Sequence, residues 1–221
     1  MGLIHSEAEL RRTIVKACRA LADKGLVAGT DGNLSVRLPS GSLLVTPSQT
    51  SKASVSEEDI LLCSAEGRRT RGAGTVSSEV QLHVAAYRLR PGLRAVVHAH
   101  PPTANAFTFA GAEAMLLEPV LPEVVARLGT VPAVPYFTPG STALADAAAA
   151  LLMRHDAVLL AQHGVVTVGG DVWNAYLLME KVEHLAITLK AAMDLAGSAQ
   201  GVKRLTPEQV AELKATYGKR A

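Results

Sequence analysis

Two apolar segments, each interrupted by histidine, constrain the fold of this chain more than any other part of its sequence. Residues 95–101 read AVVHAHP and residues 157–169 read AVLLAQHGVVTVG. Continuous apolar runs of this kind predict buried β-strands. Alternate residues of a strand point to the same face, so His98 and His100 share one face. Two imidazoles there are costly to bury unless their lone pairs are satisfied, and a divalent metal satisfies them.

A third histidine strengthens the metal interpretation. His163 interrupts the second apolar segment and is followed by Gly164. Three histidines from strand ends can complete a site that holds catalytic zinc and leaves one coordination position open. Glu79 is the best candidate for an acid/base beside such a metal. An H-x-H pair is by itself a weak motif, so from these residues alone a structural role of the pair stays open.

The other four histidines give no such signal. They lie singly on predicted helices or near the ends of predicted elements, where an imidazole is usually a surface group or a satisfied core group. We interpret these four as structural: His5, His83, His155 and His184.

The rest of the chain predicts helices packed on a sheet. Ser6 and Glu9 have the spacing of a capping box before a helical repeat, and residues 172–196 form the longest helical pattern. Ser78 could cap a helix that runs to Leu89. Further predicted helices lie at 102–110, 123–129, 141–153 and from 206 onward, and further predicted strands at 34–38, 42–48, 59–64 and 133–137. This mixture predicts a layered α/β/α fold.

Length, charge and cysteine content exclude several classes of protein. A chain of 221 residues, 48% of them hydrophobic, suits a single domain spanning 1–221. A net charge of +2 with scattered basic residues gives no nucleic-acid footprint, and no apolar run reaches the roughly 18 residues of a membrane span. No signal peptide is visible. A reduced interior best explains Cys18 and Cys63, with a single disulfide as the alternative. We therefore expect a cytoplasmic protein.

Hydroxyl-rich turns predict an anion site near the histidines. Ser77 and Ser78 precede the predicted start of a helix, where backbone N–H groups and the helix dipole attract negative charge. The turns GTDGN (29–33) and TPSQT (46–50) offer further donors. Each is an ordinary turn when taken alone. Together they indicate a pocket of phosphate size beside the metal.

Four stretches together resemble one known family. They are DGNLSVRL (31–38), LLVTPS (43–48), SSEVQLHVAAYRLRPGLRAVVHAHPP (77–102) and AVLLAQHGVVTVG (157–169). In this order they resemble the class II aldolase/adducin family, and within it the zinc-dependent fuculose- and ribulose-phosphate aldolases of bacteria. The resemblance spans about residues 6–196 and recurs in the tail. It implies a three-layer α/β/α sandwich with a mainly antiparallel central sheet, and a homotetramer with active sites between subunits.

The resemblance also assigns roles to individual residues. The implied ligands of Zn²⁺, or of another divalent metal such as Mn²⁺, are His98, His100 and His163. The implied ligands of the substrate phosphate are Asn33, Ser48, Ser77 and Ser78. Glu79 matches the catalytic acid/base. The C-terminal tail, 203–221, is expected to reach a neighbouring subunit, where Tyr217 is a candidate proton donor, with packing at an interface as its alternative role.

Three positions depart from the family pattern. Gln49 stands where fuculose-phosphate aldolase has a glycine in its phosphate loop, and Leu121 lies near the place of an active-site tyrosine. In the family a glycine usually follows the lysine at this place, but no glycine follows Lys52 here. These departures leave the substrate open without touching the metal ligands.

The resemblance implies retro-aldol cleavage of a phosphorylated ketose, similar to fuculose 1-phosphate, into dihydroxyacetone phosphate and an aldehyde. The reaction passes through a metal-stabilised enediolate. A metal-dependent decarboxylase of a 3-oxo-tetronate phosphate or of a hydroxylated aromatic acid is the first alternative. A dehydratase acting on methylthioribulose phosphate and a non-catalytic, adducin-like interaction module are the others. The expected small-molecule partner is a phosphorylated sugar.

Overall fold

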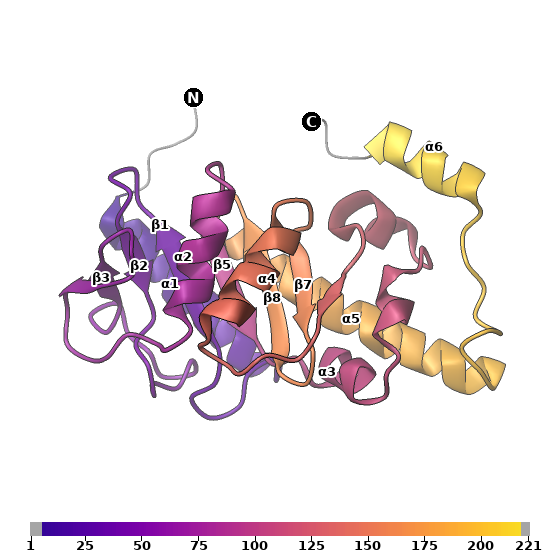
Figure 1. Cartoon of the computed structure of the whole chain (residues 1–221), viewed down its shortest axis with the longest axis horizontal. Coiled ribbons are helices and arrows are strands. Elements are labelled where there is room, and N and C mark those ends of the chain that lie inside the picture. Colours follow the sequence, from indigo (N-terminus) through magenta and orange to yellow (C-terminus); the bar gives the residue numbers. More distant parts are fainter. Residues whose placement is uncertain (1–5, 218–221) are drawn as a thin grey trace.

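The computed structural model describes residues 6–217, and within this range eight strands form one sheet (Figure 1). The spatial order is β4-β3-β2-β1-β5-β8-β7-β6, and all neighbours are antiparallel except β6 and β7. The strands are β1 (Asn33–Arg37), β2 (Leu43–Val45), β3 (Leu61–Cys63), β4 (Arg69–Arg71), β5 (Ala95–Ala99), β6 (Ala133–Val134), β7 (Ala157–Leu160) and β8 (Gly164–Gly169). The predicted, mainly antiparallel sheet is confirmed.

Helices cover both faces of this sheet and complete the predicted three-layer sandwich (Figure 1). One face is covered by α1 (Glu7–Asp23), α3 (Pro102–Phe109) and α5 (Val172–Ala196), and the other by α2 (Val80–Leu89) and α4 (Thr142–Leu152). Two short turns follow α3: the 3₁₀ helix η1 (Glu113–Leu117) and the π-helical turn η2 (Val124–Leu128). The last helix, α6 (Pro207–Tyr217), packs mainly on η2.

The central strands are apolar throughout because both faces of the sheet are buried. On β5, Val97 packs into the core under α1 and α5, whereas Val96 packs into the core under α2 and α4. Each fully buried aliphatic side chain of this size stabilises the fold by about 1.5–3 kcal/mol. Since alternate residues share a face, His98 lies on the same side of the sheet as Val96, toward α2.

Several local predictions are confirmed, and three are corrected. Ser6 and Glu9 form the capping box of α1. The segment 157–169 is a hairpin of β7 and β8 rather than one strand, because the polar residues before Gly164 form a turn. The helix α2 begins at Val80 with Glu79 as its N-cap, so Ser78 does not cap it. Strand β6 has only two residues of the five predicted.

Cys18 and Cys63 are free and buried in the cores on opposite faces of the sheet. Burial raises the pKa of the Cys18 thiol to about 12. These two cysteines therefore act as small apolar core residues. No helix in the described part of the chain is both long and apolar enough to cross a membrane.

Candidate metal centre

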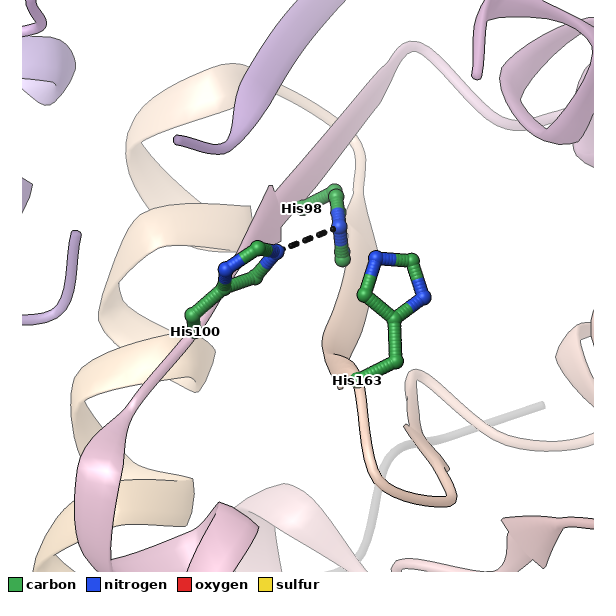
Figure 2. A group of neighbouring side chains, drawn as sticks. All are labelled: His98, His100 and His163. Carbon is green, nitrogen blue, oxygen red and sulfur yellow. Dashed lines mark hydrogen bonds between the residues drawn. The ribbon is translucent and has the colours of Figure 1, made fainter. Parts of the chain in front are cut away.

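Three histidines from two adjacent parts of the sheet converge at one point (Figure 2). His98 lies near the end of β5, His100 directly follows this strand, and His163 occupies the turn between β7 and β8. Because β5 pairs with β8, the turn lies beside the end of β5. One ligand atom from each histidine lies within 4.8 Å of the other two. The structure thus brings together the three residues that the sequence suggested as metal ligands.

Two glycines make room for this arrangement. A Cβ atom on Gly164 would lie 2.5 Å from the Ala99 carbonyl oxygen, 2.8 Å from His100 Cδ2 and 2.9 Å from His98 Cε1. A Cβ on Gly32 would lie 2.7 Å from the His98 carbonyl oxygen, and Gly32 has a φ of +74°. Only glycine allows this close approach of the backbone.

In two of the histidines, Nδ1 faces an acceptor oxygen, and this contact turns the Nε2 lone pair toward the centre. His98 Nδ1 donates to the Val165 carbonyl oxygen at 3.0 Å, and His100 Nδ1 lies 3.4 Å from Asp31 Oδ2. With both protons held at Nδ1, the two Nε2 atoms carry lone pairs, and they are 3.1 Å apart (Figure 2). Two facing lone pairs repel each other, and a cation beside them removes the repulsion. Metal-binding imidazoles usually donate the N–H of the other ring nitrogen to a carboxylate or a backbone carbonyl, as these two do.

The protonation of these rings also suits a metal. Burial lowers the pKa of His98 to about 3, although Glu79 acts in the opposite direction. Burial likewise lowers the pKa of His100. His163 points its Nε2 toward the other rings (Figure 2), while its buried Nδ1 makes no hydrogen bond with the described residues. Neutral imidazoles are the form that binds metal, and three of them form a donor set that fits a catalytic zinc ion.

Glu79 reaches the same centre from the start of α2. Its Oε1 lies 3.1 Å from His163 Nε2, and its Oε2 lies 3.4 Å from His98 Nε2. The Asn33 amide donates to Oε2 at 3.0 Å. Burial acts to raise the pKa of Glu79, but the two histidines and Asn33 outweigh it, so the pKa lies well below its usual value. The group is a carboxylate within reach of any atom bound at the histidines.

Asn33 begins β1, whereas the other three proposed phosphate ligands, Ser48, Ser77 and Ser78, lie on loops. The Asn33 amide is directed at Glu79 and, at 3.4 Å, at Ser77 Oγ. Ser77 Oγ also accepts from the Glu79 backbone N–H at 3.2 Å. Ser48 donates its backbone N–H to the Thr75 carbonyl, which places its loop alongside the segment before α2. Ser78 is exposed at the start of α2. Asn33 thus already serves as a partner of the carboxylate, and Ser77 as a partner of the Glu79 backbone N–H.

Tyr217 is not brought to the histidines within one chain. Its side chain is 63% exposed at the end of α6. Val210 of α6 lines a cavity of about 540 Å³ together with Arg90, which follows the last residue of α2. Glu79 precedes the first residue of α2, so α6 lies near the end of this helix that is far from the metal centre. The last residues of the expected tail, 218–221, lie outside the described part of the chain.

Residues that the sequence interpretation missed surround the site. Asp31 contacts His100, and His83, interpreted as structural, contacts Asn33. The spacing held a usable signal for His83, since residues four apart on a helix share a face and His83 follows Glu79 by four. Two further contacts come from distant segments: Asn105 donates to the His163 carbonyl oxygen at 2.9 Å, and both carboxylate oxygens of Glu183 accept backbone N–H groups at the start of α3. No local pattern could reveal these two.

Comparison with known proteins agrees with this geometry. The pattern of the class II aldolase and adducin N-terminal domain matches residues 12–189. The 3-oxo-tetronate 4-phosphate decarboxylase of Escherichia coli K12 is 33% identical over 210 residues, which cover 94% of this chain and 96% of the relative. The L-fuculose phosphate aldolase of Haemophilus influenzae is 36% identical over 186 residues, which cover 82% of each chain.

A solved structure shares the whole fold. The crystal structure of YgbL from Klebsiella pneumoniae superimposes with a TM-score of 0.85 at 32% identity, covering 95% of this chain and 99% of that one. The matched region of the family pattern contains the three histidines and Glu79. The chain therefore belongs to the class II aldolase and adducin family.

Proposed function

We propose that this protein is a metal-dependent decarboxylase of 3-oxo-tetronate 4-phosphate or of a closely similar phosphorylated 3-oxo acid. The observation that carries this proposal is the E. coli relative with that activity, which matches the chain almost from end to end. We prefer decarboxylation to the cleavage of a ketose phosphate expected from the sequence, because the match to the fuculose phosphate aldolase covers less of the chain.

The chemistry of such a substrate suits the site. In 3-oxo-tetronate 4-phosphate the carboxylate carbon is attached to C2, next to the C3 carbonyl. Loss of carbon dioxide breaks the C1–C2 bond and leaves the electron pair on C2, from where it spreads onto the C3 oxygen. One proton added at C2 then gives dihydroxyacetone phosphate. A divalent metal held by the three histidines would supply Lewis-acid stabilisation of the charge on that oxygen.

The residues of the chain have separate tasks in this scheme. Glu79 would pass a proton taken up from solvent to C2, because its carboxylate lies 3.1 Å and 3.4 Å from two of the three histidine rings. The proposed phosphate ligands, Asn33, Ser48, Ser77 and Ser78, would fix C2 relative to Glu79. The positive end of the α2 dipole would favour an anion at this place.

Aldol cleavage of a fuculose 1-phosphate-like ketose is the second candidate, favoured by the 36% identity to the Haemophilus aldolase. It leaves the same carbanion of dihydroxyacetone phosphate and differs only in the departing group, an aldehyde instead of carbon dioxide. The same histidines and Glu79 serve both reactions. A non-catalytic module is disfavoured, because the histidines and the carboxylate converge in a form that suits catalysis.

One experiment separates the two candidates. Purified protein, stripped with a chelator and reloaded with Zn²⁺ or Mn²⁺, is supplied with 1-¹³C-labelled 3-oxo-tetronate 4-phosphate or with fuculose 1-phosphate. We expect labelled carbon dioxide and dihydroxyacetone phosphate from the first substrate, and loss of turnover in Glu79→Gln. Aldehyde release from the second substrate alone would replace the decarboxylase by the aldolase. No turnover of either would overturn the proposal.

We further propose that the chain is one domain that assembles into a homotetramer, in which the C-terminal segment completes a neighbouring site. Its support is the position of α6 away from its own metal centre and the exposure of Tyr217. Light scattering would measure the mass of the assembly. Mixed Glu79→Gln and Tyr217→Phe subunits should recover activity that neither variant has alone, whereas no recovery would contradict a shared site.

A further inference from the structure

A buried series of hydrogen bonds leads away from Glu79 into the protein interior. It joins polar side chains of β1 to polar side chains of α2, which face each other where the two elements pack. On β1, Asn33 and Ser35 are two residues apart and share a face of the sheet. On α2, Glu79, His83 and Tyr87 follow at intervals of four and share a face of the helix. All of these side chains except Glu79 are less than 5% exposed.

From this series we propose that His83 is a positioning residue: it fixes the orientation of the Asn33 amide and thereby the direction of the Glu79 carboxylate. The proposal rests on the acid/base role proposed for Glu79. His83 itself touches neither the substrate nor the metal centre, so it acts through Asn33 alone.

The donors and acceptors of the series determine its direction. The Asn33 Oδ1 atom only accepts, so His83 Nε2, which lies 2.6 Å away, carries the proton. His83 Nδ1 is then unprotonated and accepts from the Ser35 hydroxyl at 2.7 Å. The neutral form is the stable one here, because burial lowers the pKa of His83 to about 4.

Tyr87 closes the inner end of the series. Its hydroxyl donates to the Ser35 carbonyl oxygen at 3.0 Å and lies 2.8 Å from Ser35 Oγ. Because the neutral ring carries its proton on Nε2, the Ser35 hydroxyl proton goes to His83 Nδ1 and not to Tyr87. The imidazole is therefore held from both sides and has one defined tautomer.

The accept-only carboxylate of Glu79 and this tautomer of His83 together fix the orientation of the Asn33 amide. Its Oδ1 faces the His83 N–H, so its NH₂ group faces Glu79 Oε2 at 3.0 Å. In the flipped amide, the carbonyl oxygen would face a carboxylate and the NH₂ group would face another N–H donor. Both contacts would be repulsive, and a buried polar group left unpaired is destabilising. His83 thus excludes the flipped state.

Removal of the imidazole should therefore free the amide and then the carboxylate. In His83→Phe we expect kcat to fall roughly 10–100-fold, as is usual when a supporting group of a catalytic site is lost. The affinity for Zn²⁺ should change less than about threefold, because the three histidine ligands do not depend on the direction of Glu79. His83→Gln should retain most of the activity, because its amide can donate to Asn33 and accept from Ser35.

The test combines these kinetics with readouts that need no substrate. Crystal structures of the wild type and of His83→Phe would show whether Asn33 and Glu79 turn away. Histidine-selective ¹⁵N spectra of the metal-free protein should include the signal of a ring protonated at Nε2 alone that vanishes in His83→Gln. His184→Gln, which changes an exposed histidine on α5, is the matched control and should behave like the wild type.

The outcomes are decisive in both directions. A folded His83→Phe variant with wild-type kcat, or with unmoved Asn33 and Glu79, would overturn the proposal, as would a His83→Gln variant as impaired as His83→Phe. If His83→Phe does not fold, Ser35→Ala replaces it: we expect altered ring protonation and a several-fold lower kcat, and no change would overturn the proposal. If the wild type turns over no substrate, the proposed function fails, while the crystal and ¹⁵N readouts still decide on positioning.

Discussion

Asn33 lies directly opposite His98 in the antiparallel pairing of β1 with β5. This register places the residue that holds Glu79 beside a candidate metal ligand without any contribution from a loop. A shift of one residue would turn Asn33 to the other face of the sheet, toward α1 and α5. The relative placement of Asn33 and His98 is therefore fixed by the same backbone hydrogen bonds that stabilise the sheet.

The close contacts of Gly164 predict a metal-binding defect from a single methyl group. In Gly164→Ala the new Cβ would overlap the Ala99 carbonyl and two histidine rings, so these rings must move apart. We expect Zn²⁺ affinity to fall at least about tenfold, measured by calorimetric titration. Gly170→Ala, where a Cβ meets nothing within 4 Å, is the control. Equal Zn²⁺ affinity of the two variants would contradict the argument.

The convergence of three histidines predicts one divalent ion per chain. Metal analysis of purified protein should find about one equivalent, which a chelator removes together with the activity. His98→Ala should lose this ion, because the remaining two rings form an incomplete site. The exposed His184 provides the control variant, His184→Ala, which should keep a full equivalent. Stoichiometric metal in His98→Ala would place the ion elsewhere.

Buried His83 predicts a stability that falls on acidification. Burial lowers its pKa in the folded state from the ordinary 6.5 to about 4. Between these two values the unfolded chain binds a proton that the folded chain does not, so the free energy of unfolding decreases as the pH falls. The slope is about 1.4 kcal/mol for each pH unit from this residue alone.

Urea unfolding of the metal-free protein at pH 7 and pH 4.5 measures this effect. His83→Gln, which does not titrate, should lose less stability over the same range than the wild type. The other buried histidines titrate in both proteins, so only the difference between the two slopes reports on His83. Parallel curves would show that His83 keeps an ordinary pKa.

Glu183 predicts a link between α5 and the start of α3. Its carboxylate accepts from the backbone N–H groups of Thr103 and Ala104 at 2.9 Å each, and it is 7% exposed. Glu183→Gln replaces one acceptor oxygen by a donor, and we expect a loss of about 1–3 kcal/mol in urea unfolding. Exposed Glu123 gives the control, Glu123→Gln, with a change below about 0.5 kcal/mol. If Glu183→Gln lost as little stability as Glu123→Gln, the link would be ruled out.

Local patterns predicted most elements of the fold because local physics determines them. The capping box of Ser6 and Glu9 and the helix at 172–196 follow from nearest neighbours along the chain. The hairpin of β7 and β8 was missed, because periodicity cannot separate two buried strands from one when the turn is only three residues long. Here the turn contains Gln162, whose φ of 56° is uncommon for a residue other than glycine.

The site was predictable only in part. The strand spacing of His98 and His100 and the resemblance to a family led to the three rings. The role of Asn33 as a partner of Glu79 depends on the pairing of β1 with β5 and on how α2 packs against them, which the sequence does not state. The contacts of Glu183 could not be predicted for the same reason, since they join segments about 80 residues apart.

The histidines belong to two parts of the chain that are distant in sequence. His100 precedes α3, and His163 follows β7, so α3, η1, η2, β6, α4 and β7 lie between them. A single ion bound to both would close this whole segment into a ring, as a disulfide does, but in a form that a chelator can reopen. Closing a ring of this length restricts the unfolded chain, and an ion that binds only the folded chain stabilises it in proportion to the logarithm of its concentration. The ion would therefore hold nearly a third of the molecule in a closed ring that a chelator can reopen, in addition to its role in catalysis.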